Sequence, residues 1–141
     1  MAAPPAALGA VVLAVCLGTP ARASLWPDTS VTPPEAALSG DGSALAAAAR
    51  GGIELNARYP IRRVFLAAGP AEATALEAAV IAGRADMAAF AIELGAAPSD
   101  AQVAVLHCLL DRHPSTALAD LLTARFGVRH RAPCADADLP R

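Results

Sequence analysis

The chain has 141 residues, which is enough for one small domain, and a formal net charge of −2 at pH 7. Hydrophobic residues make up 55% of it but aromatic residues only 4%, so a core must be built mainly from Ala and larger aliphatic side chains. The near-neutral charge, with no basic run and no aromatic platform, excludes nucleic-acid binding as the expected function.

The first segment of the chain is apolar over residues 6–17. This run is shorter than the roughly 20 residues that a membrane-spanning helix needs, but it suits the apolar region of a signal peptide. Ala21-Arg22-Ala23 then matches an A-x-A cleavage site. We therefore interpret residues 1–23 as a signal peptide and expect a periplasmic or secreted protein without stable membrane insertion. A disordered apolar leader and a misplaced start codon are the alternatives.

Cleavage after residue 23 would leave Cys108 and Cys134 as the only cysteines. Two cysteines in an exported chain are compatible with one disulfide, and the alternative is a buried Cys108 with a free thiol in the tail. Residues 24–40 contain three prolines and predict a linker that ends in a turn. Residues 128–141 predict a polar C-terminal tail.

The middle of the chain predicts a helix–turn–helix hairpin over residues 74–97. Met87, Phe90, Ala91 and Leu94 are spaced i, i+3, i+4 and i+7, which places them on one face of a helix. Gly83 can adopt the left-handed conformation that ends the preceding helix. A lone hairpin of this size cannot bury both apolar stripes, so it requires neighbours.

Two further units line up with this hairpin. Residues 42–52 align with residues 73–83, and Leu106 follows Leu76 by nearly the same spacing as Leu76 follows Leu45. The second helices are expected just before three glycines. They are predicted over Ile61–Leu66 before Gly69, over Met87–Ile92 before Gly95, and over Leu118–Leu122 before Gly127.

The sequence Thr74-Ala75-Leu76-Glu77-Ala78-Ala79 stands where the ankyrin family has T-P-L-H-x-A, and Leu106-His107 restores the Leu-His pair. The pattern thus resembles ankyrin repeats. The resemblance implies that residues 41–127 form an all-α, ankyrin-like solenoid of about three helix-turn-helix repeats with short or missing β-fingers. The first unit carries extra residues in Ile53–Tyr59 and lacks most of a finger between Gly69 and Thr74. Another helical-pair solenoid and a small helical bundle are the alternatives.

For the residues that could form a catalytic or metal-binding site, we favour a structural role. The resemblance implies a structural role for His107, and Cys108 points about 100° away from it on a helix, so we expect no metal site with His113. The chain has no G-x-S-x-G motif and no phosphate-binding glycine loop. We therefore expect no enzyme activity and no cofactor.

The resulting hypothesis is a non-catalytic protein–protein interaction module of the bacterial cell envelope, a monomer whose partner is another protein. An immunity protein or inhibitor acting on a secreted toxin, a structural accessory, and a small-molecule or metal carrier are the alternatives. Tyr59, Arg62 and Arg63 offer an aromatic–Arg cluster of the kind enriched at interface hot spots, unless Tyr59 only covers a helix end and the arginines are solvated. The resemblance adds a concave face, lined by Ala47, Arg50, Ala78, Ile81, Cys108 and Asp111.

Overall fold

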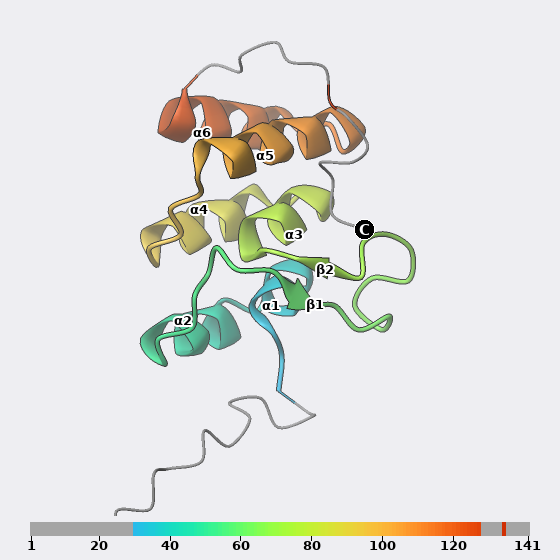
Figure 1. The fold of residues 1–141 in the computed structure, drawn as a ribbon, viewed down its shortest axis with the longest axis vertical. Helices are drawn as coiled ribbons and strands as arrows, with labels where there is room; N and C mark the ends of the chain where they lie inside the picture. The colour runs from blue at the N-terminus through green and yellow to red at the C-terminus, as the bar shows by residue number, and fades with distance from the viewer. Residues whose placement is uncertain (1–29, 128–133, 135–141) are drawn as a thin grey trace, which may run out of the picture.

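The computed structural model describes residues 30–127 and Cys134, and in this part the chain forms six helices and two short strands (Figure 1). The elements are α1 (Pro33–Ser39), α2 (Gly42–Arg50), β1 (Tyr59–Pro60), β2 (Glu72–Ala73), α3 (Ala75–Ile81), α4 (Ala85–Glu93), α5 (Asp100–Arg112) and α6 (Thr116–Phe126). The predicted signal peptide, most of the predicted tail and the start of the predicted linker lie outside the described residues. The fold that is described is predominantly helical.

The helices pack as three pairs that lie in layers. Helix α1 contacts α2, α3 contacts α4, and α5 contacts α6. Between the pairs, α3 packs on both α1 and α5, while α4 packs on both α2 and α6. The α3/α4 pair is therefore the middle layer, with the other two pairs on either side of it (Figure 1).

Small side chains dominate the core between these layers. Helix α3 buries nearly every residue, and its Ala75, Ala78 and Ala79 are wholly inaccessible to solvent. Leu45, Leu106, Leu118 and Leu122 are the largest buried apolar side chains that complete the core. Each such Leu contributes roughly 1.5–3 kcal/mol on burial, whereas an Ala contributes far less. A core of this composition depends on other interactions for part of its stability.

The three first helices, α1, α3 and α5, all begin with a capping box, in which the side chain at the third helical position accepts a hydrogen bond from the N-cap N–H. The pairs are Thr32 with Glu35, Thr74 with Glu77, and Ser99 with Gln102. Gly40 and Gly83 follow α1 and α3 with φ of 76° and 67°, a conformation that ends a helix and that residues with a Cβ rarely adopt.

The first helical pair differs from the sequence prediction. Residues 33–39 were expected to belong to a linker but form α1, and residues 42–50 form the second helix of the pair instead of the first. The sequence T-x-x-E-A-A explains how the first pair aligns with the second. It occurs at residues 32–37 as well as at 74–79, so the start of α1 corresponds to the start of α3. Pro33 and Pro34 are compatible with this helix because residues of the first turn have no intrahelical partner for their N–H.

The other two pairs agree with the prediction. Helices α3 and α4 lie within the predicted hairpin at residues 74–97, with Gly83 in the turn, and this prediction is confirmed. Met87 and Ala91 are buried as the stripe requires, although Phe90 and Leu94 are only half-buried. Helices α5 and α6 form the third pair.

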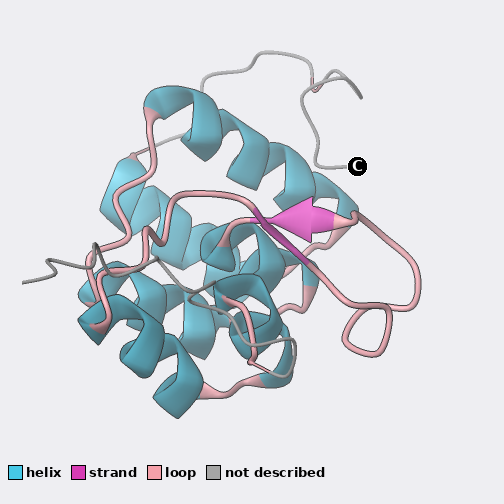
Figure 2. Cartoon of the chain, turned by 60° about the horizontal axis from the view of Figure 1, so that its bottom comes forward, coloured by secondary structure: helices cyan, strands magenta, loops and turns pink. Residues whose placement is uncertain are grey.

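The connections between the pairs are unequal. Residues 94–99 link α4 to α5 directly, whereas residues 51–74 between α2 and α3 contain the antiparallel strands β1 and β2. Tyr59 pairs with Ala73 and Pro60 with Glu72, and the loop between the strands projects from the helical layers (Figure 2). The prediction of a second helix at residues 61–66 is wrong, and so is that of a largely missing finger between residues 69 and 74. A projecting β-hairpin occupies this part of the chain.

Candidate protein-binding surface

The segment from residue 53 to residue 62 crosses the N-termini of all three first helices. One residue of the segment hydrogen-bonds to the third residue of each helix, and these residues follow the order of the layers. Asn56 lies at α5, Arg58 at α3 and Arg62 at α1. The capping boxes therefore serve a second purpose, because the side chains that close them also hold the chain that leads into the β-hairpin.

The contact at α1 is the most extensive of the three. The Glu35 carboxylate is wholly buried and accepts hydrogen bonds from Nε and Nη2 of Arg62, both at 2.9 Å. It also accepts the backbone N–H of Arg62 at 2.8 Å and that of Thr32 at 3.0 Å. Both carboxylate oxygens are thus fully engaged, as a buried charge requires.

These hydrogen bonds decide the ionisation of Glu35. Burial by itself raises the pKa of this carboxyl, but the hydrogen bonds from the Arg62 side chain and from the N–H groups of Arg62 and Thr32 outweigh it, so the pKa lies below its ordinary value of 4.5. The same pairing with Glu35 raises the pKa of the Arg62 guanidinium. The ion pair is therefore charged at neutral pH, and Glu35 is a structural group with no free oxygen for acid–base chemistry.

The contacts at α3 and α5 are simpler. Glu77 is 1% exposed and accepts one hydrogen bond from Nη2 of Arg58 at 2.9 Å, in addition to the N–H of Thr74. Gln102 at α5 donates from Nε2 to the carbonyl oxygen of Asn56 at 2.8 Å. Each layer therefore anchors the crossing segment, and the anchor nearest the β-hairpin has the most hydrogen bonds.

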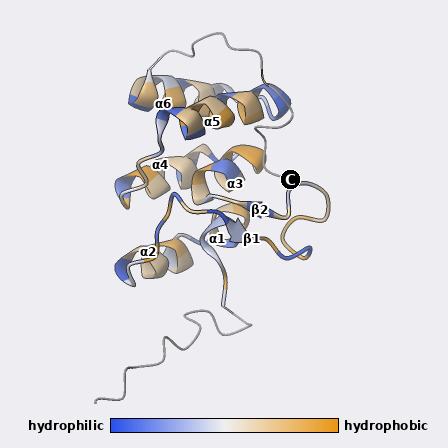
Figure 3. Ribbon diagram, viewed as in Figure 1, coloured by the Kyte–Doolittle hydropathy of each residue, from blue (hydrophilic) through white to orange (hydrophobic). Residues whose placement is uncertain are grey.

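The tip of the hairpin exposes apolar side chains. Val64 is 85% exposed, and among the described residues it is the one large hydrophobic side chain that is exposed to this degree. The neighbouring Phe65 and Leu66 are half-buried and pack against the core, with the guanidinium carbon of Arg62 5.0 Å from the Phe65 ring centroid. Arg63 is exposed, and its Nη1 donates to the carbonyl oxygen of Gly69 across the loop at 3.3 Å. Figure 3 shows hydrophobic segments in this loop.

We call Arg63, Val64 and the loop around them, residues 61–71, the hairpin tip. The Ile61 N–H donates to the carbonyl oxygen of Ala71 at 2.8 Å, which closes the base of the tip, and the N–H of Phe65 donates to that of Arg62 within it. An ordered loop that presents an exposed apolar side chain beside a cation loses less conformational entropy on binding than a mobile loop would.

The three residues of the predicted aromatic–Arg cluster have different environments in the structure. Tyr59 is half-buried in β1 and donates from its hydroxyl to the Glu54 carbonyl oxygen at 2.9 Å; burial and the nearby Glu54 charge raise its pKa. Arg62 is committed to Glu35. Only Arg63 is presented at the tip.

The residues of the predicted concave face also differ in exposure and position. Ala78 is 0% exposed and cannot contact a partner, because all residues of α3 from 75 to 80 are buried. The assignment of Ala78 to the binding face is therefore wrong. Ile81 is half-buried at the end of α3, while Arg50 and Asp111 are exposed at the ends of α2 and α5. Ala47 is exposed on α2, which the corrected register makes a second helix. These positions do not form one continuous face of first helices.

Sequence reasoning missed the residues that position the hairpin, namely Glu35, Arg58, Glu77 and Gln102. A local signal existed for three of them, because T-x-x-E and S-x-x-Q mark helix starts. Arg58 had no such signal, since its partner lies 19 residues away along the chain.

Cys108 and Cys134 are joined by a disulfide, with their Cα atoms 5.5 Å apart. Cys108 is 8% exposed on α5, so the bridge ties Cys134 to the last helical pair. A Sγ atom in a disulfide is not a thiolate ligand. Within residues 30–127 and Cys134, no three His, Cys, Asp or Glu side chains come together as metal ligands would.

Among the described residues, no helix has the length and hydropathy to cross a membrane. Comparisons with protein-family models, curated proteins and solved structures found no match to this chain.

Proposed function

We propose that the protein is a non-catalytic scaffold of the bacterial cell envelope that binds another protein, and that its three helical pairs form an ankyrin-like stack. The observation that carries the proposal is the hairpin tip, where Val64 is 85% exposed on a loop whose base is held against the layers by ion pairs to two buried carboxylates. An inhibitor of a secreted toxin is a special case of this function, since it also requires a protein partner.

The arrangement of the helices supports the resemblance to ankyrin repeats. First helices pack on first helices and second helices on second helices, and T-x-x-E-A-A opens both α1 and α3. Repeats of this kind bury apolar surface only against their neighbours, and insertions between them provide binding surface. The projecting hairpin between α2 and α3 is such an insertion.

The chemistry of the tip supports a protein partner. An exposed aliphatic side chain needs an apolar pocket to leave water, and the adjacent Arg63 guanidinium is suited to a carboxylate at the rim of that pocket. The Arg62 charge is already balanced by Glu35, so the tip presents the single Arg63 guanidinium at its surface instead of a basic patch. This pattern does not favour nucleic acid.

The disulfide supports an exported location, because such bonds persist in oxidising compartments and are rare in the cytosol. If residues 1–23 are removed, the first residue of the protein isolated from its host is Ser24. Intact-mass measurement tests this directly, and a full-length protein that still contains residues 1–23, with all three of its cysteines as free thiols, would contradict it.

Photo-cross-linking in the native host tests the binding surface. A photoreactive amino acid at position 64 should give one defined cross-linked protein, whereas the same group at Asp120, exposed on α6, should not. With the probe at Ala67, in the same loop, the Val64→Asp substitution should abolish the product. Absence of a product at position 64, or equal products at 64 and 120, would contradict the proposal.

A further inference from the structure

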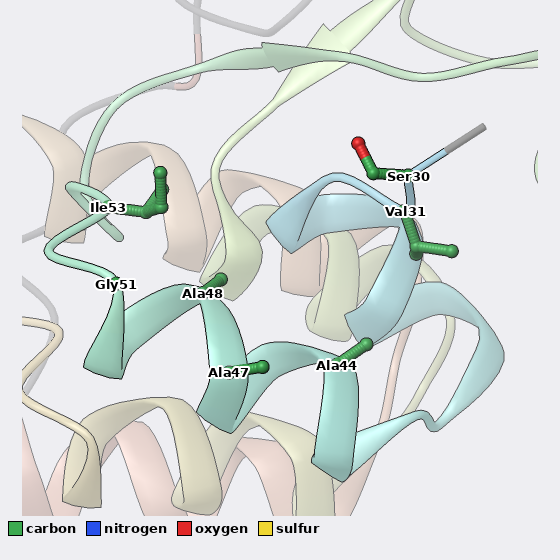
Figure 4. A pocket seen from close by; sticks show the side chains of 7 residues that line it. All are labelled: Ser30, Val31, Ala44, Ala47, Ala48, Gly51 and Ile53. Carbon is green, nitrogen blue, oxygen red and sulfur yellow. The ribbon is translucent and has the colours of Figure 1, made fainter. Parts of the chain in front are cut away.

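The first helical pair carries an apolar hollow that the hairpin does not use. It has a volume of about 340 Å³ and lies along α2, between the residues that precede α1 and the residues that follow α2 (Figure 4). Ala44, Ala47 and Ala48 form its floor, with Val31 on one side and Ile53 on the other. The single hydroxyl on its border belongs to Ser30.

The hollow lies in the end layer of the stack, where we expect an apolar side chain to cover it. The α1/α2 pair packs on one neighbouring pair alone, since it is the end of the three layers. End units of stacked repeats need a cap that removes their apolar surface from water. The small Ala side chains of the floor leave room for a large one.

The sequence supplies such a side chain a few residues before the rim of the hollow. Trp26 is the only tryptophan of the chain, and Leu25 precedes it. The described chain begins at Ser30, which itself borders the hollow, and Trp26 is four positions before it along the chain. Four steps along the chain span at most about 14 Å, which keeps the indole within reach of the hollow. The other residues from 24 to 29 are polar or proline.

We propose that Trp26, with Leu25 beside it, folds back into this hollow and caps the first helical pair. A tryptophan side chain removes about 150–250 Å² from water when it is buried, and its N–H can remain at the rim. Residues 24–29 lie outside the described part of the chain, so this docking is proposed. It is independent of the proposed function, but it leaves the hairpin tip, and not this hollow, for a partner.

Tryptophan fluorescence tests this directly, because a single tryptophan reports on one site. In protein purified from its host, we expect native emission at shorter wavelength than that of the unfolded chain, with weak quenching by acrylamide. Ala47→Glu places a charge in the floor and should move the emission towards that of the unfolded chain. Ala117→Glu, at an exposed position of α6, should leave it unchanged, and far-UV circular dichroism should show both variants to be folded.

A second pair of variants covers the case in which Ala47→Glu fails to fold. Ala47→Leu fills the hollow with an apolar group and should displace Trp26, with the same shift in emission. Trp26→Ala should lower the thermal midpoint, and its effect should not add to that of Ala47→Leu. Three results would overturn the proposal: native emission equal to that of the unfolded chain, emission unaffected by both Ala47 variants, or emission that depends on protein concentration, which indicates docking on a second copy.

Discussion

Two buried glutamates occupy the same position in two helices that share the sequence T-x-x-E-A-A, yet they are held differently. Glu35 accepts a two-pronged contact from Arg62 and a backbone N–H from the same residue, whereas Glu77 accepts a single contact from Arg58. The difference shows that the same helix-start sequence can hold the crossing segment by different numbers of hydrogen bonds. The contact with the larger number of hydrogen bonds lies at the base of the hairpin tip.

The largest expected effect is on stability when each carboxylate is removed. Glu35→Ala should cost about 3–4 kcal/mol, since a hydrogen bond to a charged group contributes roughly 1.5–3 kcal/mol and several are lost together. Glu77→Ala should cost less, about 2 kcal/mol, because one Arg contact and one cap are lost. Denaturant unfolding measures both.

Glu72→Ala serves as the control for these variants. Glu72 is exposed on β2, and a surface substitution of this kind changes stability by less than about 0.5 kcal/mol. Equal losses for Glu35→Ala and Glu77→Ala would show that the additional contacts of Arg62 do not matter.

A second prediction concerns acid pH. Hydrogen bonds from Arg62 and Thr32 outweigh burial and lower the pKa of Glu35 below 4.5 in the folded protein, so the unfolded chain binds more protons in this range. The contribution of Glu35 to stability is therefore complete above 4.5 and is lost as the pH falls through the lowered pKa. The stability gap between the wild type and Glu35→Gln should shrink on acidification.

Denaturant unfolding of the two proteins between neutral pH and acid measures this gap. Asp41, whose pKa is lowered by hydrogen bonds from Ala44 and Ser43, contributes equally to both and cancels in the comparison. A gap that stays constant with pH would contradict the assigned ionisation.

The smallest expected effect distinguishes the two arginines. Arg62→Lys should lower the thermal midpoint more than Arg58→Lys, because an ammonium group cannot reproduce a two-pronged contact but can replace a single one. Differential scanning calorimetry measures the two midpoints. Equal shifts would mean that the guanidinium geometry at Glu35 is not used.

The sequence allowed the middle helical pair to be predicted, because its apolar stripe and Gly83 are local signals. The first pair was misplaced for a physical reason. Pro33-Pro34 and Gly42 resemble breaks in a helix, but the prolines occupy a first turn and the glycine begins α2. Ile61, Val64 and Phe65 have helical spacing, yet they lie in a hairpin in which Ile61 is buried and Val64 is exposed.

The candidate site was less predictable than the fold. Arg62 and Glu35 are 27 residues apart, so their contact depends on the path of the whole segment between α2 and α3, which no local pattern encodes. Counting cysteines left Cys108 and Cys134 as the possible pair, with a buried Cys108 and a free tail thiol as the open alternative, and the structure shows the disulfide. Arg63 was identified by its residue type, while Val64 was assigned to a helix stripe and its exposure was missed.

We infer that Glu35 holds the hairpin tip in a fixed, ordered conformation. Amide hydrogen exchange at Arg62 tests it most directly, because this N–H donates to the buried Glu35 carboxylate at 2.8 Å. We expect the Arg62 amide to be strongly protected in the wild type and to exchange much faster in Glu35→Ala. In both proteins, the amides of α4 should exchange only at the rate that global unfolding of that protein allows. An Arg62 amide that exchanges in the wild type at the rate of an unstructured chain would contradict the account.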